Sequence, residues 1–176
     1  LVLLDLSAAF DTVDHPTLIK RLEKHFGITQ EALTWIKSYL SDRTQSVKIN
    51  SSSSSDQKLT CNVPQGSVLG PTFFSDYSSP LAELIRSFGV KVHLYADDSQ
   101  LFLAFKPGID EDVAISKLEE CILHVRSWMA QNFLKLNDDK TEFLIIGSRH
   151  QLAKVKTKSI RVGLSEIQSS DCARNI

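Results

Sequence analysis

Two carboxylates stand side by side where the chain is expected to reverse direction between two alternating segments. Apolar residues alternate with polar ones before and after this pair: Val90, Val92 and Leu94, then Leu101, Leu103 and Phe105. A period of two is typical of half-buried strands, so the pattern predicts a hairpin whose turn is the polar tetrad 97–100. Aspartate is common in turns because its carboxylate accepts hydrogen bonds from nearby amides, and the hairpin alone therefore indicates only a solvated turn.

A third acid, Asp5, changes that interpretation. It follows residues 1–4, an apolar run short enough for a buried strand. The compact segment 7–11 can turn closely around a ligand, which would let three acids from two strand ends converge on a divalent cation. Hard cations such as magnesium take oxygen ligands and usually share them with substrate phosphates. Two such ions about 4 Å apart serve in-line phosphoryl transfer, and this is the chemistry that the three acids favour.

Four segments, in this order along the chain, resemble the palm motifs of reverse transcriptases. They are LDLSAAFD at 4–11, VPQGSVLGP at 63–71, YADD at 95–98 and LNDDKT at 136–141. The sequence closely resembles the polymerases of LINE-type (non-LTR) retrotransposons of animals, and the resemblance extends from residue 1 to about residue 150. One such motif is weak evidence, whereas four motifs in order are specific.

The resemblance implies an α+β fold, the polymerase palm, in which helices pack on one face of an antiparallel sheet. The open face is expected to receive primer and template. Residues 1–150 are assigned to the reverse transcriptase palm core, and residues 151–176 to the truncated start of the connection between palm and thumb. Fingers and thumb are expected to be largely absent from this chain.

Apolar spacing predicts the individual elements. Helical spacing places three sets of residues in the core: Leu18, Leu22 and Phe26 before Gly27; Leu33, Ile36 and Leu40 after a capping Thr29; and Ile115, Leu118, Ile122, Val125 and Met129 after the acids 110–112. Trp128 and Phe133 adjoin the last set and are also expected in the core. A further helix is expected between residues 66 and 88. Strands are expected at 47–49, 59–63 and 143–147, with the serine run 51–55 as an exposed loop.

The net charge bears on nucleic-acid binding, and the cysteine content bears on metal sites, disulfides and compartment. The formal net charge is −1 and the pI is about 6.6, whereas a surface that binds nucleic acid is expected to be basic. We therefore expect weak or no nucleic-acid binding by this chain alone. The three cysteines are widely spaced, which indicates neither a zinc site nor a disulfide framework and is typical of a reducing, intracellular compartment. No apolar run approaches the roughly 18 residues of a membrane span.

The resemblance also implies roles for individual residues. Asp5, Asp97 and Asp98, together with the backbone carbonyl of Leu6, are expected to hold two Mg²⁺ ions, for which Mn²⁺ can substitute. Six residues are expected to bind the incoming nucleotide: Ser7, Ala8, Ala9, Phe10, Gln65 and Gly66. The amides of the first three would cradle the triphosphate. The amide side chain of Gln65 suits the nucleotide sugar and base edge.

Two of these roles have a plain structural alternative. An aromatic ring at Phe10 would exclude the ribose 2′-hydroxyl, but the same ring can be an ordinary core residue. Lys140 looks like the motif lysine that protonates departing pyrophosphate. Its alternative is a surface lysine in a solvated charge cluster with Asp138 and Asp139.

The sequence thus favours the catalytic core of an RNA-directed DNA polymerase, which would use an RNA template, a DNA primer and a deoxynucleotide. The chain alone is expected to be inactive. A second hypothesis is a non-catalytic relic or interaction module that keeps the palm. A third, a palm-type cyclase or other nucleotidyl transferase, does not predict Gln65-Gly66 between the acids.

Overall fold

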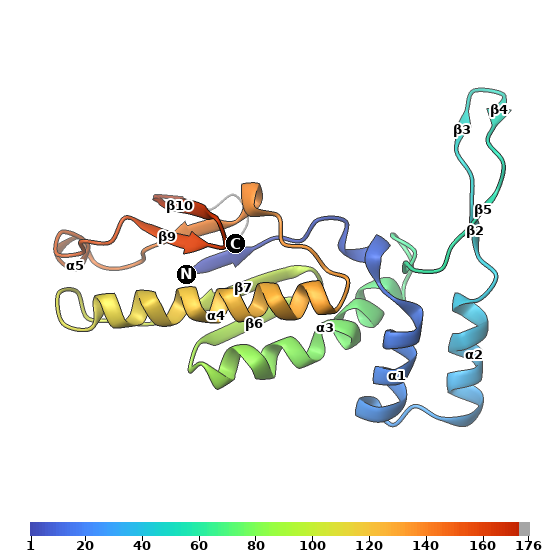
Figure 1. Cartoon of the computed structure of the whole chain (residues 1–176), viewed down its shortest axis with the longest axis horizontal. Helices are drawn as coiled ribbons and strands as arrows, with labels where there is room; N and C mark the ends of the chain where they lie inside the picture. Colours follow the sequence, from blue (N-terminus) through green and yellow to red (C-terminus); the bar gives the residue numbers. More distant parts are fainter. Residues whose placement is uncertain (173–176) are drawn as a thin grey trace. The chain divides into compact units, whose positions relative to one another are not determined.

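The computed structural model describes residues 1–172, which form two compact units (Figure 1). The first unit combines Leu1–Ser7 with the chain from Ser78 onward, and the second is Ala8–Tyr77. Each unit is considered by itself below. None of the helices in the described part of the chain is long and apolar enough to cross a membrane.

A six-stranded sheet organises the first unit. Its strands are β1 (Val2–Leu4), β6 (Lys91–Tyr95), β7 (Asp98–Phe102), β8 (Glu142–Leu144), β9 (Ser159–Val162) and β10 (Ser165–Ser170). In space the order is β6-β7-β1-β8-β10-β9, and every neighbouring pair is antiparallel except β10 with β8. The N-terminal strand β1 therefore lies between two strands from much later in the chain.

Helices cover one face of this sheet. α4 (Glu111–Gln131) lies along the sheet and contacts β9 (Figure 1). Most of the residues predicted for its inward face are buried, namely Leu118, Ile122, Val125 and Met129, while Ile115 is only half-buried. The second half of α3 (Gly70–Ser87) buries Leu81 and Ile85. On the sheet, Val2, Leu4 and Leu101 are buried, whereas Tyr95 is exposed, so one face is apolar and the other open. The predicted α+β architecture is confirmed.

β6 and β7 form the predicted hairpin, but its turn is shorter and earlier than the tetrad 97–100. Tyr95 pairs with Asp98, so only Ala96 and Asp97 lie in the turn, and Ala96 has a φ of 51°. Ser99 is buried. The prediction placed the turn where the sequence becomes polar. The ladder instead continues through these polar residues. Asp98 and Gln100 lie on the open sheet face, Ser99 is tolerated on the buried face, and a two-residue turn matches the strand twist.

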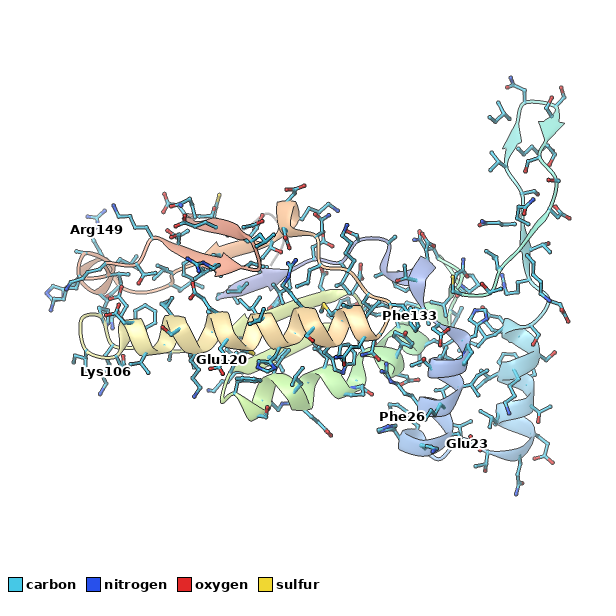
Figure 2. The ribbon with its side chains drawn as sticks, in the orientation of Figure 1. Glu23, Phe26, Lys106, Glu120, Phe133 and Arg149 are labelled. Atoms are coloured by element: carbon cyan, nitrogen blue, oxygen red, sulfur yellow. The ribbon has the colours of Figure 1, made fainter. Side chains whose placement is uncertain are left out.

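The second unit begins with a short 3-10 helix and two α-helices. η1 (Ala9–Thr12) leads into α1 (His15–Phe26), which Asp14 caps by accepting the Thr17 amide at 2.9 Å. α2 (Gln30–Leu40) follows. The predicted inward residues Leu18, Leu22, Leu33, Ile36 and Leu40 are buried. Phe26 was expected to join them but is exposed at the C-terminal end of α1, one turn beyond the last buried position (Figure 2).

A two-stranded arm follows α2 in the same unit. It consists of two short ladders, β2 (Thr44–Gln45) with β5 (Gln57–Lys58) and β3 (Lys48–Ile49) with β4 (Ser52–Ser53). The serine run is exposed as expected, but it is not simply a loop, since part of it pairs as β4. Val47 and Ile49 are exposed, so their alternation does not mark a buried strand. The predicted strand 59–63 is reduced to a single bridge between Cys61 and Asp14.

Two predictions in the first unit fail at the ends of elements. Phe133 lies just beyond the C-terminal end of α4 and is exposed rather than in the core (Figure 2). β8 ends at Leu144, so Ile146 is exposed, not part of a buried strand. The chain then forms the short helix α5 (Arg149–Leu152) before β9. In each case an apolar residue continues a local pattern after the packed element has ended.

A buried carboxylate, Glu111, ties the start of α4 to the segment before β9. The residue is only 4% exposed. Its Oε1 accepts the amides of Lys156 at 2.8 Å and Thr157 at 2.6 Å. Burial raises the pKa of Glu111, but the hydrogen bonds from Thr157, Lys156 and Gly108 outweigh it and hold the pKa below its ordinary value. The ionised carboxylate therefore stabilises the fold.

We expect Glu111→Gln to lower the free energy of unfolding by roughly 2 kcal/mol at pH 7, the scale of hydrogen bonds to a charged group. Because the folded pKa is depressed, the wild-type advantage is present above the unfolded pKa and is lost as the pH falls through the folded pKa. Urea unfolding of both variants from pH 7 to pH 3 measures this difference. Asp112→Asn, an exposed neighbour, should change little. A difference that is constant across this range would contradict the assignment.

The start of α3 packs tightly against the loop before it. The Ser67 hydroxyl donates to the Pro64 carbonyl at 2.7 Å and accepts the Gly70 amide at 3.0 Å. A Cβ on Gly70 would lie 2.9 Å from the Pro64 carbonyl oxygen and 3.1 Å from Ser67 Oγ. Glycine is required here because no side chain fits between the helix and this loop.

Gly70→Ala tests this close approach. Replacing glycine by alanine in a helix interior stabilises by about 1 kcal/mol, and a smaller gain of the same sign would be expected at Gly70, the first residue of α3, if space allowed. Here we expect the opposite sign, a loss of roughly 1–3 kcal/mol, because the added methyl group overpacks the loop. Thermal and urea unfolding measure the change. Thr72→Ala, at an exposed position in the same helical turn, is the matched control, and a stabilising Gly70→Ala would refute the packing argument.

Candidate active site

The pairing of β1 with β7 brings two of the predicted acids together. Leu3 pairs with Gln100 and Leu4 with Ser99, so the next position in this register sets Asp5 opposite Asp98. Both side chains share the open face with Leu3 and Gln100, because side chains alternate along a strand. Directly opposed residues in an antiparallel pair have Cβ atoms about 4.5–5.5 Å apart. The fold therefore places two carboxylates next to each other on the uncovered side of the sheet.

Asp97 adds a third carboxylate from the two-residue turn. Partial burial raises the pKa of Asp98, and the charges of Asp97 and then Asp5 raise it further. The three acids thus repel one another, and such a site favours a bound cation. In the described part of the chain, no three His, Cys, Asp or Glu side chains stand close enough together to hold a metal ion as they are. The carboxylates of Asp97 and Asp5 are near enough to raise the pKa of Asp98, but the side chains do not form a ready metal-binding cluster.

The backbone carbonyl of Leu6 points toward the same place. Beyond β1, Leu6 forms a bridge with Leu136. The flanking residues make the hydrogen bonds of this bridge: Asn137 donates to the Asp5 carbonyl at 2.9 Å, and the Ser7 amide donates to the Lys135 carbonyl at 2.8 Å. In an antiparallel ladder the residue between such bonds directs its own amide and carbonyl to the other side. That side is the one on which β7 pairs with β1.

Lys140 lies against the first acid. The turn η2 (Asp138–Lys140) follows the strand-like segment 135–137. It carries Lys140 Nζ to 3.1 Å from Asp5 Oδ2. Asp138, expected as a partner of Lys140 in a solvated cluster, instead forms an ion pair with Arg126 of α4. Lys140 therefore stands beside Asp5 with a side chain that is 64% exposed, a position compatible with either interpretation of this residue.

The predicted nucleotide-binding residues beyond Ser7 lie in the second unit. Val63 donates its amide to the Phe10 carbonyl at 2.9 Å, which holds the segment before Gln65 and Gly66 beside η1. Both loop residues are exposed, and Gly66 has a φ of 76°, a conformation that favours glycine. Ala8 is also exposed, while Ala9 is buried.

The ring of Phe10 is half-buried. Its centroid lies 5.3 Å from that of the buried Phe74 at a tilt of 39°. One part of the ring thus packs in the core of the second unit while another part stays accessible, a position compatible with either interpretation of Phe10.

Sequence reasoning missed two features of the site. The first is the polar lining of the open face beside the acids, where His93, Tyr95 and Gln100 form a shallow pocket with Asp98. Its signal was present, because these residues occupy every second position of the hairpin strands. The second is Arg126, which gives no signal of its own, since an arginine on an amphipathic helix usually faces solvent.

Comparisons with known proteins identify the family of this chain. A sequence model of the family described as reverse transcriptase (RNA-dependent DNA polymerase) matches residues 1–164. The chain is 30% identical over 152 residues to the RNA-directed DNA polymerase from mobile element jockey of Drosophila melanogaster, covering 83% of this chain and 16% of the relative. It is 31% identical over 145 residues to the probable RNA-directed DNA polymerase from transposon BS of the same species, covering 80% of this chain and 16% of the relative. The chain thus spans about a sixth of these curated relatives.

A solved structure shares the fold. Telomerase from Candida albicans, in complex with a TWJ fragment of telomeric RNA, superposes with a TM-score of 0.62 at 16% identity over 97% of this chain and 29% of the telomerase chain. The predicted similarity to polymerases of mobile elements and the predicted palm fold are both confirmed. Because the family model covers nearly all of the sequence, this chain belongs to the reverse transcriptase (RNA-dependent DNA polymerase) family.

Proposed function

We propose that this chain is the catalytic palm of a mobile-element polymerase that copies an RNA template into DNA by adding deoxynucleotides to a primer 3′-hydroxyl. The observation that carries the proposal is the β1–β7 register, which sets Asp5 opposite Asp98 on the open face, beside Asp97 in the turn. Family membership supports the reaction class. The RNA template, DNA primer and deoxynucleotide are partners of the longer polymerase.

The carboxylates of Asp5, Asp97 and Asp98 and the carbonyl of Leu6 would hold two divalent ions, Mg²⁺ in the cell and Mn²⁺ as a substitute. The oxygen-only donor set fits hard cations. The pKa of Asp98 is raised by partial burial and then by the charges of Asp97 and Asp5, and this repulsion fits a site that is completed by positive charge. When bound, such ions would activate the attacking oxygen and neutralise the leaving one.

Lys140 would act as the general acid of the reaction. Its ammonium group stands at the rim of the carboxylate cluster, 3.1 Å from Asp5 Oδ2, and can transfer a proton to an oxygen of the departing pyrophosphate. The side chain is 64% exposed, so it is free to turn from the carboxylate toward a bound triphosphate. Loss of this proton donor would slow the chemical step more than nucleotide binding.

The nucleotide itself would be bound by Ser7, Ala8, Ala9, Phe10, Gln65 and Gly66. Small residues allow the triphosphate to approach their backbone amides. Gln65 offers both a donor and an acceptor from an exposed loop, and the adjacent Gly66 leaves room for the sugar. The accessible part of the Phe10 ring would sense the 2′ position of that sugar.

Replacing Asp97 by Asn tests the catalytic assignment. In a full-length polymerase of the jockey type that carries this segment, we expect RNA-templated primer extension with Mg²⁺ to fall by roughly 100-fold or more, as for other losses of preorganised charge. The exposed Asp112→Asn is the matched control and should extend the primer normally. The 176-residue chain alone should extend negligibly, because its net charge of −1 gives little affinity for a duplex. Full activity of Asp97→Asn would overturn the proposal.

The sugar-sensing role of Phe10 predicts a change in selectivity rather than in overall rate. Phe10→Val, in the same full-length polymerase, should raise incorporation of ribonucleotides while deoxynucleotide use is largely kept, because only a steric block is removed. Phe10→Tyr retains the ring and should retain discrimination. Single-nucleotide incorporation with matched ribo- and deoxynucleotides gives the ratio of kcat/KM. An unchanged ratio in Phe10→Val would leave the residue as a core aromatic.

A further inference from the structure

Arg126, in the second half of α4, points to the turn that carries Lys140. Its guanidinium forms an ion pair with the carboxylate of Asp138, the first residue of η2. The two side chains are 32% and 27% exposed, so the pair is partly shielded from water. A charge-assisted hydrogen bond in such a place is stronger and more directional than an ion pair on the open surface.

The guanidinium is also confined from a second direction. Gly163, in the turn between β9 and β10, lies so close that a Cβ there would be 2.9 Å from both Cζ and Nε of Arg126. Gly163 has a φ of 64°, so glycine is favoured at this turn for its backbone as well. The hairpin and the helix together therefore restrict where the Arg126 head group can lie.

The turn held by this pair has fixed connections to the catalytic strand. Asn137 donates its amide to the Asp5 carbonyl at 2.9 Å. Within the turn, the Lys140 amide donates to the Asn137 carbonyl at 3.2 Å. The Thr141 amide donates to the Asp138 carbonyl at 3.2 Å, and the Thr141 hydroxyl donates to the Asn137 carbonyl at 2.9 Å. Thr141 is buried. The backbone direction at Lys140 thus depends on the conformation of three residues between Asn137 and Thr141.

We infer that Arg126 is a positioning residue, which holds η2 in the conformation that directs Lys140 toward Asp5. The inference rests on the proposed function of Lys140 and adds a residue that touches neither nucleotide nor metal. The long Lys140 side chain is largely exposed and has many rotamers. Its reach to the active site is therefore set by the backbone of η2, and the Arg126–Asp138 pair anchors that backbone to α4.

Amide hydrogen exchange of the 176-residue chain tests the structural part without any activity. Arg126→Gln should lower the protection of the Lys140 and Thr141 amides by at least about 10-fold, equivalent to about 1.4 kcal/mol. The β1–β7 ladder amides should keep their protection. Arg86→Gln, at an exposed position on α3, is the matched control and should change neither set. Unchanged exchange at Lys140 and Thr141, or an equal fall throughout the sheet, would overturn the inference.

Charge reversal separates the ion pair from general packing. Arg126→Glu and Asp138→Arg should each loosen η2, and the double variant should recover at least part of the lost protection because the pair is re-formed with opposite polarity. A double variant that is no better than the two single variants would also overturn the inference. This test remains valid even where a single variant is less stable overall, because the two single variants and the double variant are compared in one double-mutant cycle.

Kinetics connect the turn to the reaction. In the full-length polymerase, Arg126→Gln should lower kcat about as much as Lys140→Gln while the KM for deoxynucleotides changes little, and Arg126→Lys should restore part of the rate. A fall of kcat without the matching change in hydrogen exchange would refute positioning by η2. If hydrogen exchange responds as expected but wild-type polymerase shows no synthesis, the proposed function fails while the anchoring role of Arg126 stands.

Discussion

The antiparallel register between β1 and β7 is the constraint on which the rest of the site depends. Leu3 pairs with Gln100 and Leu4 with Ser99, and the continuation of this register by one position sets Asp5 opposite Asp98. A slip by one residue would exchange the two faces of β1. The apolar residues at positions 2 and 4 would then face water, and Asp5 would enter the core. Burial of these two side chains therefore fixes the register, and the register aligns the carboxylates.

The same alignment has an electrostatic cost. Burial and the neighbouring charges of Asp97 and Asp5 raise the pKa of Asp98, so the acids oppose one another when all are ionised. The ammonium group of Lys140, 3.1 Å from Asp5 Oδ2, offsets part of this repulsion. A cluster arranged in this way is suited to a ligand that supplies positive charge. Like charges held close together cost stability, which is common where charges are held ready for catalysis.

Local patterns predicted the parts of the fold that depend on local packing. The buried faces of α1 and α2 were predicted correctly at Leu18, Leu22, Leu33, Ile36 and Leu40, because helical periodicity indicates which face of a helix is buried. Element ends were predicted less well. Phe26, Phe133 and Ile146 continue an apolar pattern past the end of a packed element and are exposed. The turn of the β6–β7 hairpin was misplaced because polarity is not a reliable sign of a turn in a strand with an open face.

The sequence alone determined the family and the residues proposed for the reaction, since four motifs in order carry both. It also indicated that Asp5 ends a strand and that Asp97 and Asp98 adjoin a hairpin turn. Only the tertiary structure decided which residues meet. The contact of Lys140 with Asp5 joins positions far apart in the chain, and Asp138 turns to Arg126 rather than to Lys140. Such contacts follow from strand order and helix packing, which join distant segments that no local pattern of hydrophobicity or charge relates to each other.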